Sequence, residues 1–210
     1  MWTPPRRLVG DLTILGGVLA IVATVPPRWY GPIPTDSYVF EPPLFSPLWI
    51  ERVVLPPLSV LAALLVVVGL LSLFRRDRPW MGRWHRWSAS AAILGGAVGT
   101  LATTLFAATG GGSDDLTAAA TALLGALLAL VALVFALPGL IGWGIGYLRA
   151  ERDRQTLGLA LVGAPVLAAL FVAVGAVVGS VAELAGGLPT VLPFAALAVV
   201  VGVDLRQRRS

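Results

Sequence analysis

The chain has 210 residues, of which 57% are hydrophobic and only 12% are charged, and its mean hydropathy is +0.87. A soluble domain carries about a quarter charged residues, so this composition excludes an ordinary soluble protein and predicts an integral membrane protein. All fifteen basic residues are arginines, the formal net charge is +4, and the lack of cysteine excludes disulfides, thiol catalysis and iron–sulfur ligation.

Six hydrophobic runs are long enough to cross a hydrocarbon core about 30 Å thick, which takes about 20 residues. The first run carries Asp11 and is followed by no small-residue cleavage site, which favours an uncleaved helix over a signal peptide. The fourth run is too long for one straight span, so we expect Pro138-Gly139 to kink it. The sequence therefore predicts an all-α integral membrane protein, a single transmembrane domain over residues 1–210 that forms a bundle of six helices. The expected spans are residues 8–25, 53–74, 88–108, 116–148, 156–182 and 190–205.

The arginines are distributed unevenly between the two sides of this six-span protein. Thirteen of the fifteen fall on one side, and only Arg28 and Arg52 fall on the other. Basic residues accumulate on the cytoplasmic side of membrane proteins, so the pattern predicts a multi-pass protein of the cell membrane with both termini cytoplasmic. A five-span alternative would place the terminal RQRR outside. The arginine bias, with abundant alanine, glycine, valine and leucine, is typical of a prokaryotic genome of high GC content.

The connection RRDRPWMGRWHRW, residues 75–87, concentrates five arginines, three tryptophans and the single histidine. Arginines and aromatic rings can bind nucleic acid, but a connection of this length between two spans is too short for such a domain. We interpret it as a topology signal without a nucleic-acid partner, with His85 facing the headgroups. Its arginines also suit anionic lipid headgroups. The predicted membrane-interface anchors are Arg75, Arg76, Arg78, Trp80, Trp84 and Trp87.

The first and third spans share a pattern, ILGGVLAIVAT at 14–24 and ILGGAVGTLAT at 93–103. Small residues at four-residue spacing let helix backbones approach closely within a membrane. Either an ancestral duplication or coincidence between two segments rich in small residues accounts for the similarity, and both interpretations predict helix contacts at these positions. The packing candidates are Gly16, Ala20, Thr24, Gly95, Gly99 and Thr103.

The first outer loop, residues 26–49, holds seven prolines and six aromatic residues. Proline-rich segments are stiff and extended rather than helical, so we expect this loop to lie across the outer mouth of the bundle. Two interpretations stay open: a structural cap anchored by aromatic rings, and a lid or docking surface.

Enzyme chemistry finds little support in the sequence. Metal sites need several converging His, Cys, Asp or Glu ligands, and a phosphate-binding loop needs a lysine that this chain lacks. We therefore predict no catalytic, cofactor or metal site. Asp11 and Asp204 are expected to form interfacial ion pairs with Arg7 and Arg208. Glu183, at an outer helix end with no basic neighbour in sequence, remains the candidate for a functional role.

Two functional hypotheses follow. The first is a non-catalytic accessory, packing or assembly component of a larger membrane complex, with the lipid bilayer, another membrane subunit or a second copy as partner. The second is a small solute-binding or permease subunit. In its size, span number and small-residue stripes the chain loosely resembles the substrate-binding components of energy-coupling-factor transporters. That resemblance implies solute binding within a six-helix bundle and assigns no residue.

Overall fold

The computed structural model describes residues 6–24, 49–108, 116–150, 154–178 and 188–207. Within these ranges the chain is helical, with no strand, as the sequence predicts. Its elements are α1 (Arg6–Thr24), η2 (Ile50–Val54), α3 (Leu55–Asp77), α4 (Arg83–Ala108), α5 (Leu116–Ala150), α6 (Gln155–Val178) and α8 (Leu188–Gln207). Five of the six long helices, all except α8, are long and apolar enough to cross a membrane, which indicates a multi-pass membrane protein.

Prolines shape two of these helices differently. Pro56 and Pro57 occupy the first turn of α3, where a missing N–H is tolerated, and the π-helical turn η2 leads directly into it. Pro138 lies inside α5, yet this helix continues from Leu116 to Ala150. At 35 residues α5 is about 52 Å long, well beyond the hydrocarbon thickness of about 30 Å.

Two helices extend further into the arginine-rich connection than hydropathy predicts. The helix α3 continues to Asp77 and α4 already begins at Arg83, so only residues 78–82 connect them. Arginine is a good helix former and tryptophan and histidine are tolerated, whereas a hydropathy average ends a span at the first charges. Most of RRDRPWMGRWHRW is therefore helix rather than loop.

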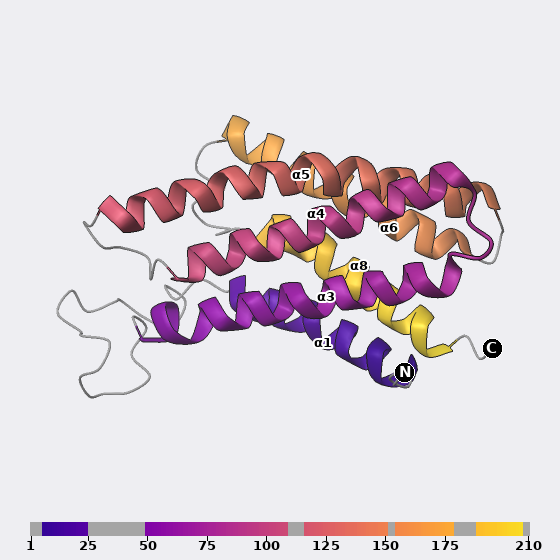
Figure 1. Cartoon of the computed structure of the whole chain (residues 1–210), viewed down its shortest axis with the longest axis horizontal. Helices are drawn as coiled ribbons and strands as arrows, with labels where there is room; N and C mark the ends of the chain where they lie inside the picture. Colours follow the sequence, from indigo (N-terminus) through magenta and orange to yellow (C-terminus); the bar gives the residue numbers. More distant parts are fainter. Residues whose placement is uncertain (1–5, 25–48, 109–115, 151–153, 179–187, 208–210) are drawn as a thin grey trace.

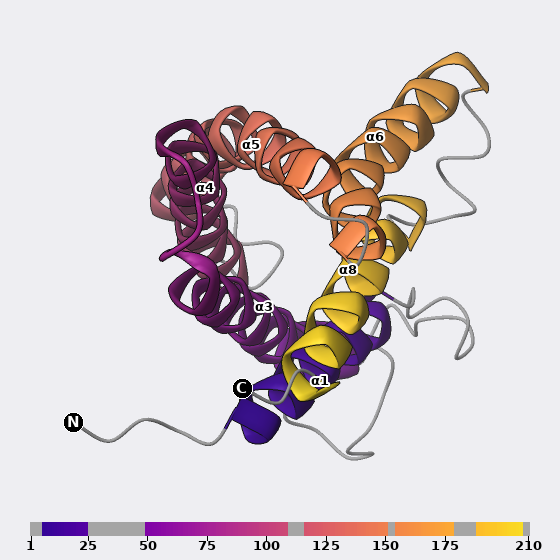
Figure 2. The ribbon, with the colours of Figure 1, turned by 90° about the vertical axis from the view of Figure 1, so that its right-hand side faces the viewer.

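The six long helices form a closed ring in the order α1, α3, α4, α5, α6 and α8, with α8 packed against α1 (Figures 1 and 2). The helices α1, α4 and α6 begin, and α3, α5 and α8 end, at one end of the bundle, on the right of Figure 1. We call this the arginine end, because every arginine with a described side chain lies there. These are Arg7, Arg75, Arg76, Arg78, Arg83, Arg86, Arg149, Arg154 and Arg206.

The buried core is concentrated near the arginine end. Every long helix contributes buried side chains from its segment near that end, including Val9 of α1 and the fully buried Leu73, Trp143, Leu161 and Val201. In the opposite half, by contrast, α5 exposes apolar side chains on several faces and the second half of α6 leads away from the ring (Figure 2). The large buried side chains of the ring thus lie mainly near the arginine end.

Candidate functional site

A buried group of charged side chains joins four elements at the arginine end. It consists of Arg76 and Asp77 from the last turn of α3, Tyr147 from the last turn of α5, Arg154 just before α6, and Asp204 from the last turn of α8. We refer to these five residues as the Asp77 cluster. Sequence analysis did not single out Asp77, Tyr147 or Arg154.

Asp77 lies at the centre of this cluster, where its carboxylate contacts Arg76, Arg154 and Tyr147. Its two oxygens face the Arg76 guanidinium, with Nε to Oδ1 at 2.8 Å and Nη2 to Oδ2 at 3.0 Å. Arg154 Nη1 lies 2.8 Å from Oδ2, and the Tyr147 hydroxyl donates a hydrogen bond of 2.5 Å to the same oxygen. One carboxylate therefore holds the ends of α3 and α5 and the start of α6 together.

Arg76 extends the cluster to α8. Its Nη2 lies 2.5 Å from Asp204 Oδ2, and its Nη1 donates to the Asp204 carbonyl oxygen at 3.4 Å. Asp204 therefore contacts a neighbouring helix, and Arg208, its expected partner, lies outside the described residues. The expected pair of Asp11 with Arg7 is replaced by a contact between helices, because Asp11 on α1 contacts Arg206 on α8 at 3.1 Å.

The cluster is charge-balanced and largely shielded from solvent. Two guanidinium groups face two carboxylates, and the Asp77 side chain is only 1% exposed. Isolated buried charges are costly, whereas a paired and hydrogen-bonded group tolerates burial because the partners compensate for lost hydration. Removing one partner leaves the others uncompensated, so each member depends on the rest.

Aromatic rings cover one side of the cluster. The Arg154 guanidinium lies 4.5 Å from the centroid of the Trp80 ring and 5.8 Å from that of Tyr147, distances that suit cation–π attraction. His85 makes edge contacts with both rings, at 5.4 and 5.1 Å. It is only 8% exposed, so the prediction that His85 faces the headgroups is wrong. Its Nε2 atom forms no hydrogen bond within the described residues.

Glycines of α5 allow α4 to reach this site. A Cβ added to Gly142 would lie 2.5 Å from the Ser88 hydroxyl, and one added to Gly146 would lie 2.7 Å from the His85 ring. Gly144 faces the other way, with an added Cβ 2.8 Å from the Gly158 carbonyl of α6. The segment GWGIGY thus alternates between two helix interfaces and places Trp143 and Tyr147 in the core between them.

The predicted packing residues differ in how closely they approach the neighbouring helix. A Cβ on Gly16 would lie 2.8 Å from Leu65 on α3, and one on Gly95 would lie 2.5 Å from the Ala136 backbone on α5, whereas Gly99 has ordinary spacing to Ala132. The hydroxyls of Thr24 and Thr103 donate to carbonyls of their own helices, those of Ala20 and Gly99 respectively.

The predicted interface anchors divide into two groups. Arg76 and Trp80 belong to the buried site and its aromatic cover. Arg75, Arg78, Trp84 and Trp87 are exposed, the two tryptophans by 80% and 67%. Glu183 and residues 26–48 of the outer loop lie outside the described residues.

In the described part of the chain, no three His, Asp or Glu side chains converge in a way that could hold a metal ion.

Several hydroxyls within the helices donate to a carbonyl one turn earlier, including those of Thr13, Ser59, Thr100, Thr104 and Thr121. The arrangement of the Asp77 cluster is suited to holding helices together rather than to presenting a free reactive group.

Comparison with known proteins adds no assignment. No protein family, no curated protein and no solved structure matches this chain significantly.

Proposed function

We propose that the chain is a non-catalytic multi-pass protein of the cell membrane that serves as an accessory or assembly component of a larger membrane complex. The observation that supports this proposal concerns the partners of the polar side chains. The buried charges are neutralised inside the Asp77 cluster, and hydroxyls within the helices donate to their own backbone. What the opposite half of the bundle offers outward is apolar surface.

That apolar surface is largest on α5 and α6. Exposed leucines on α5 include Leu123, Leu127 and Leu130, and α6 exposes Leu170 and Phe171. Helices associate in a bilayer through close packing rather than through a hydrophobic effect. Such surface is compatible with lipid contact, and on this proposal part of it packs against a helix of another membrane subunit.

Site-specific photo-crosslinking in intact cells tests this role. A photoreactive residue at Leu127 or Leu170 is expected to yield a discrete adduct with another membrane protein. The matched control is Leu15, a comparably exposed leucine on α1. Adducts with lipid alone from all three positions would contradict an accessory role.

The orientation belongs to the same proposal. The arginines whose side chains the structure describes gather at one end of the bundle, so the positive-inside tendency favours a cytoplasmic arginine end and cytoplasmic termini. The cysteine-free chain allows a direct test with an impermeant thiol reagent on intact cells. Leu116→Cys should react and Trp84→Cys should react only after permeabilisation, because both positions are highly exposed at opposite ends. The reverse pattern contradicts the orientation.

A solute-binding or permease subunit is the second candidate. Two features favour this candidate: the six helices form a closed ring, and the Asp77 cluster holds that ring together at the arginine end. This candidate predicts that a purified sample without other subunits gains thermal stability with one class of small solute. A stoichiometric membrane partner and no stabilising solute would favour the accessory role instead.

A further inference from the structure

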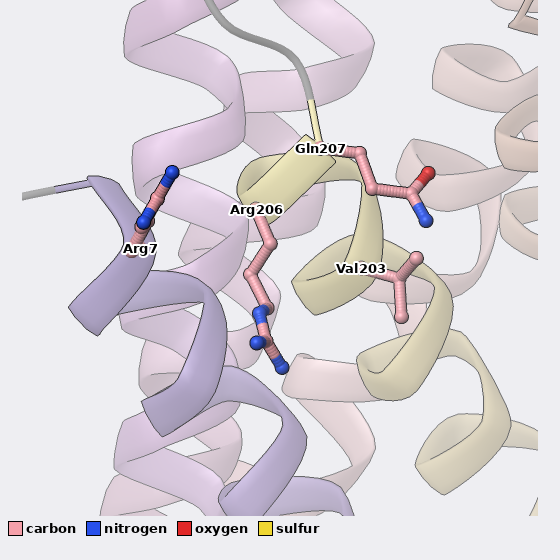
Figure 3. Close-up of a pocket in the computed structure, with 4 residues that line it drawn as sticks. All are labelled: Arg7, Val203, Arg206 and Gln207. Atoms are coloured by element: carbon pink, nitrogen blue, oxygen red, sulfur yellow. The ribbon is translucent and has the colours of Figure 1, made fainter.

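An open pocket with a volume of about 420 Å³ lies between α1 and α8 at the arginine end, and no residue of the Asp77 cluster lines it. Arg7 projects from α1 on one side of it, Arg206 extends along the seam between the helices, and Val203 and Gln207 extend from α8 on the other side (Figure 3). The guanidinium groups of Arg7 and Arg206 and the amide of Gln207 line the pocket, and Val203 adds a small apolar surface.

Close approach of the two backbones builds this pocket. A Cβ added to Gly10 would lie 2.7 Å from both the Gly202 carbonyl oxygen and the Arg206 Cγ. A Cβ added to Gly202 would lie 2.6 Å from the Gly10 carbonyl oxygen. The glycine pair therefore brings α1 and α8 together beside Arg206 and fixes where the base of its side chain lies.

The charge at the pocket suits a singly charged anion. Arg206 contacts Asp11 at 3.1 Å, and both side chains are about half exposed, at 53% and 55%. Arg7 forms no ion pair within the described part of the chain. Among the described side chains here, two arginines and one aspartate leave one net positive charge, which matches the single negative charge of a phosphodiester.

Apolar side chains continue from the pocket along both helices. On α1 the exposed Leu15, Val18 and Val22 follow Arg7 and Asp11 at helical spacing, so they share one face. On α8 the exposed Leu192 and Val199 lie on the face that ends in Val203 and Arg206. A free phosphate ion would gain nothing from these stripes, whereas the acyl chains of a phospholipid would lie along them.

We propose that this pocket binds the phosphodiester headgroup of an anionic phospholipid. Arg7 and Arg206 contact the phosphate oxygens, Gln207 donates an amide N–H, and the acyl chains follow the stripes on α1 and α8. Basic pockets between helices at the cytoplasmic level suit anionic headgroups. The proposal rests on the membrane placement stated above but not on the accessory role, so loss of a protein partner leaves it intact.

Native mass spectrometry of the full-length protein in mild detergent tests the proposal. The protein is titrated with phosphatidylglycerol, phosphatidylcholine or phosphatidylethanolamine of equal chain length. We expect one saturable phosphatidylglycerol site, weakened at least about tenfold in the double variant R7Q/R206Q, since each arginine near a membrane surface contributes about fivefold. The control R149Q, compared with the single variants R7Q and R206Q, removes one charge from an exposed position at the same end and should bind as the parent does.

Three outcomes overturn the proposal. These are equal loss in the control variant, equal retention of phosphatidylcholine, or displacement of the lipid by millimolar inorganic phosphate, which would indicate a free-phosphate site. Asp11→Asn adds a sharper test, because it raises the net charge of the pocket from +1 to +2. It should tighten phosphatidylglycerol binding. If Asp11→Asn instead abolishes retention of phosphatidylethanolamine, the carboxylate holds an ammonium group and the anionic-lipid assignment is wrong.

Discussion

The arginine end and the opposite half of the bundle are stabilised by different interactions. At the arginine end, ion pairs, glycine contacts and an aromatic cover bring five helices together around Asp77. In the opposite half, α5 packs mainly against α4 and exposes leucines elsewhere. Lipid solvates apolar side chains as well as another helix does, so close helix packing arises where polar groups and small residues require it.

Loss of the central carboxylate should have the largest effect on this asymmetry. Asp77→Asn leaves Arg76 and Arg154 without their shared counter-charge, which is expected to lower the free energy of unfolding by about 3–5 kcal/mol. Denaturant titration in mixed micelles measures it. The control Asp11→Asn removes a half-exposed partner and should cost at most about 1 kcal/mol. Equal effects of the two variants would remove the distinction between buried and exposed pairs.

The same truncation in the two halves compares them directly. Leu73→Ala, in the core at the arginine end, should destabilise by about 2–5 kcal/mol through the cavity it leaves. Leu127→Ala, exposed on α5, should change the stability of the isolated protein by no more than about 0.5 kcal/mol. Similar losses at the two positions would mean that the opposite half is packed within the isolated chain.

A variant that lacks only the Tyr147 hydroxyl measures the stability contributed by its hydrogen bond separately from that of the ion pairs. Tyr147→Phe deletes the donor to Asp77 while keeping the ring against His85 and Trp143. Hydrogen bonds to charged groups contribute about 1.5–3 kcal/mol, and a loss in that range is expected from unfolding in micelles. Thr121→Val, which removes an exposed hydroxyl bonded to its own helix, should be nearly neutral.

Glycine substitutions test the packing on α5 at the smallest scale. A Cβ on Gly139 would collide with the Ala92 backbone of α4, so Gly139→Ala should destabilise by about 1–3 kcal/mol. Gly163→Ala on α6 meets no atom within 4 Å and should be neutral or stabilising by up to about 1 kcal/mol, because alanine favours helix. Equal effects of the two substitutions would show that helix propensity, rather than the close approach of α4, determines the change in stability.

Part of the site could be anticipated from sequence and part could not. Gly16 and Gly95 lie in regular small-residue patterns, and both meet a neighbouring helix closely. Asp77 carried a weaker signal, a single acidic residue among the five arginines of RRDRPWMGRWHRW, which a count of basic residues averages away. Arg154 and Asp204 are separated from it by 77 and 127 positions, so nothing local connects them.

The amino-acid sequence by itself determined the helical class, the membrane character and the segregation of arginines, because hydropathy and charge act over each segment independently. Only the tertiary structure decided which charges meet. Arg76 and Arg78 are two residues apart, yet the ring turns Arg76 inward to Asp77 and Asp204 and leaves Arg78 exposed. That choice depends on where α5, α6 and α8 end in space, which is set by contacts between helices far apart along the chain.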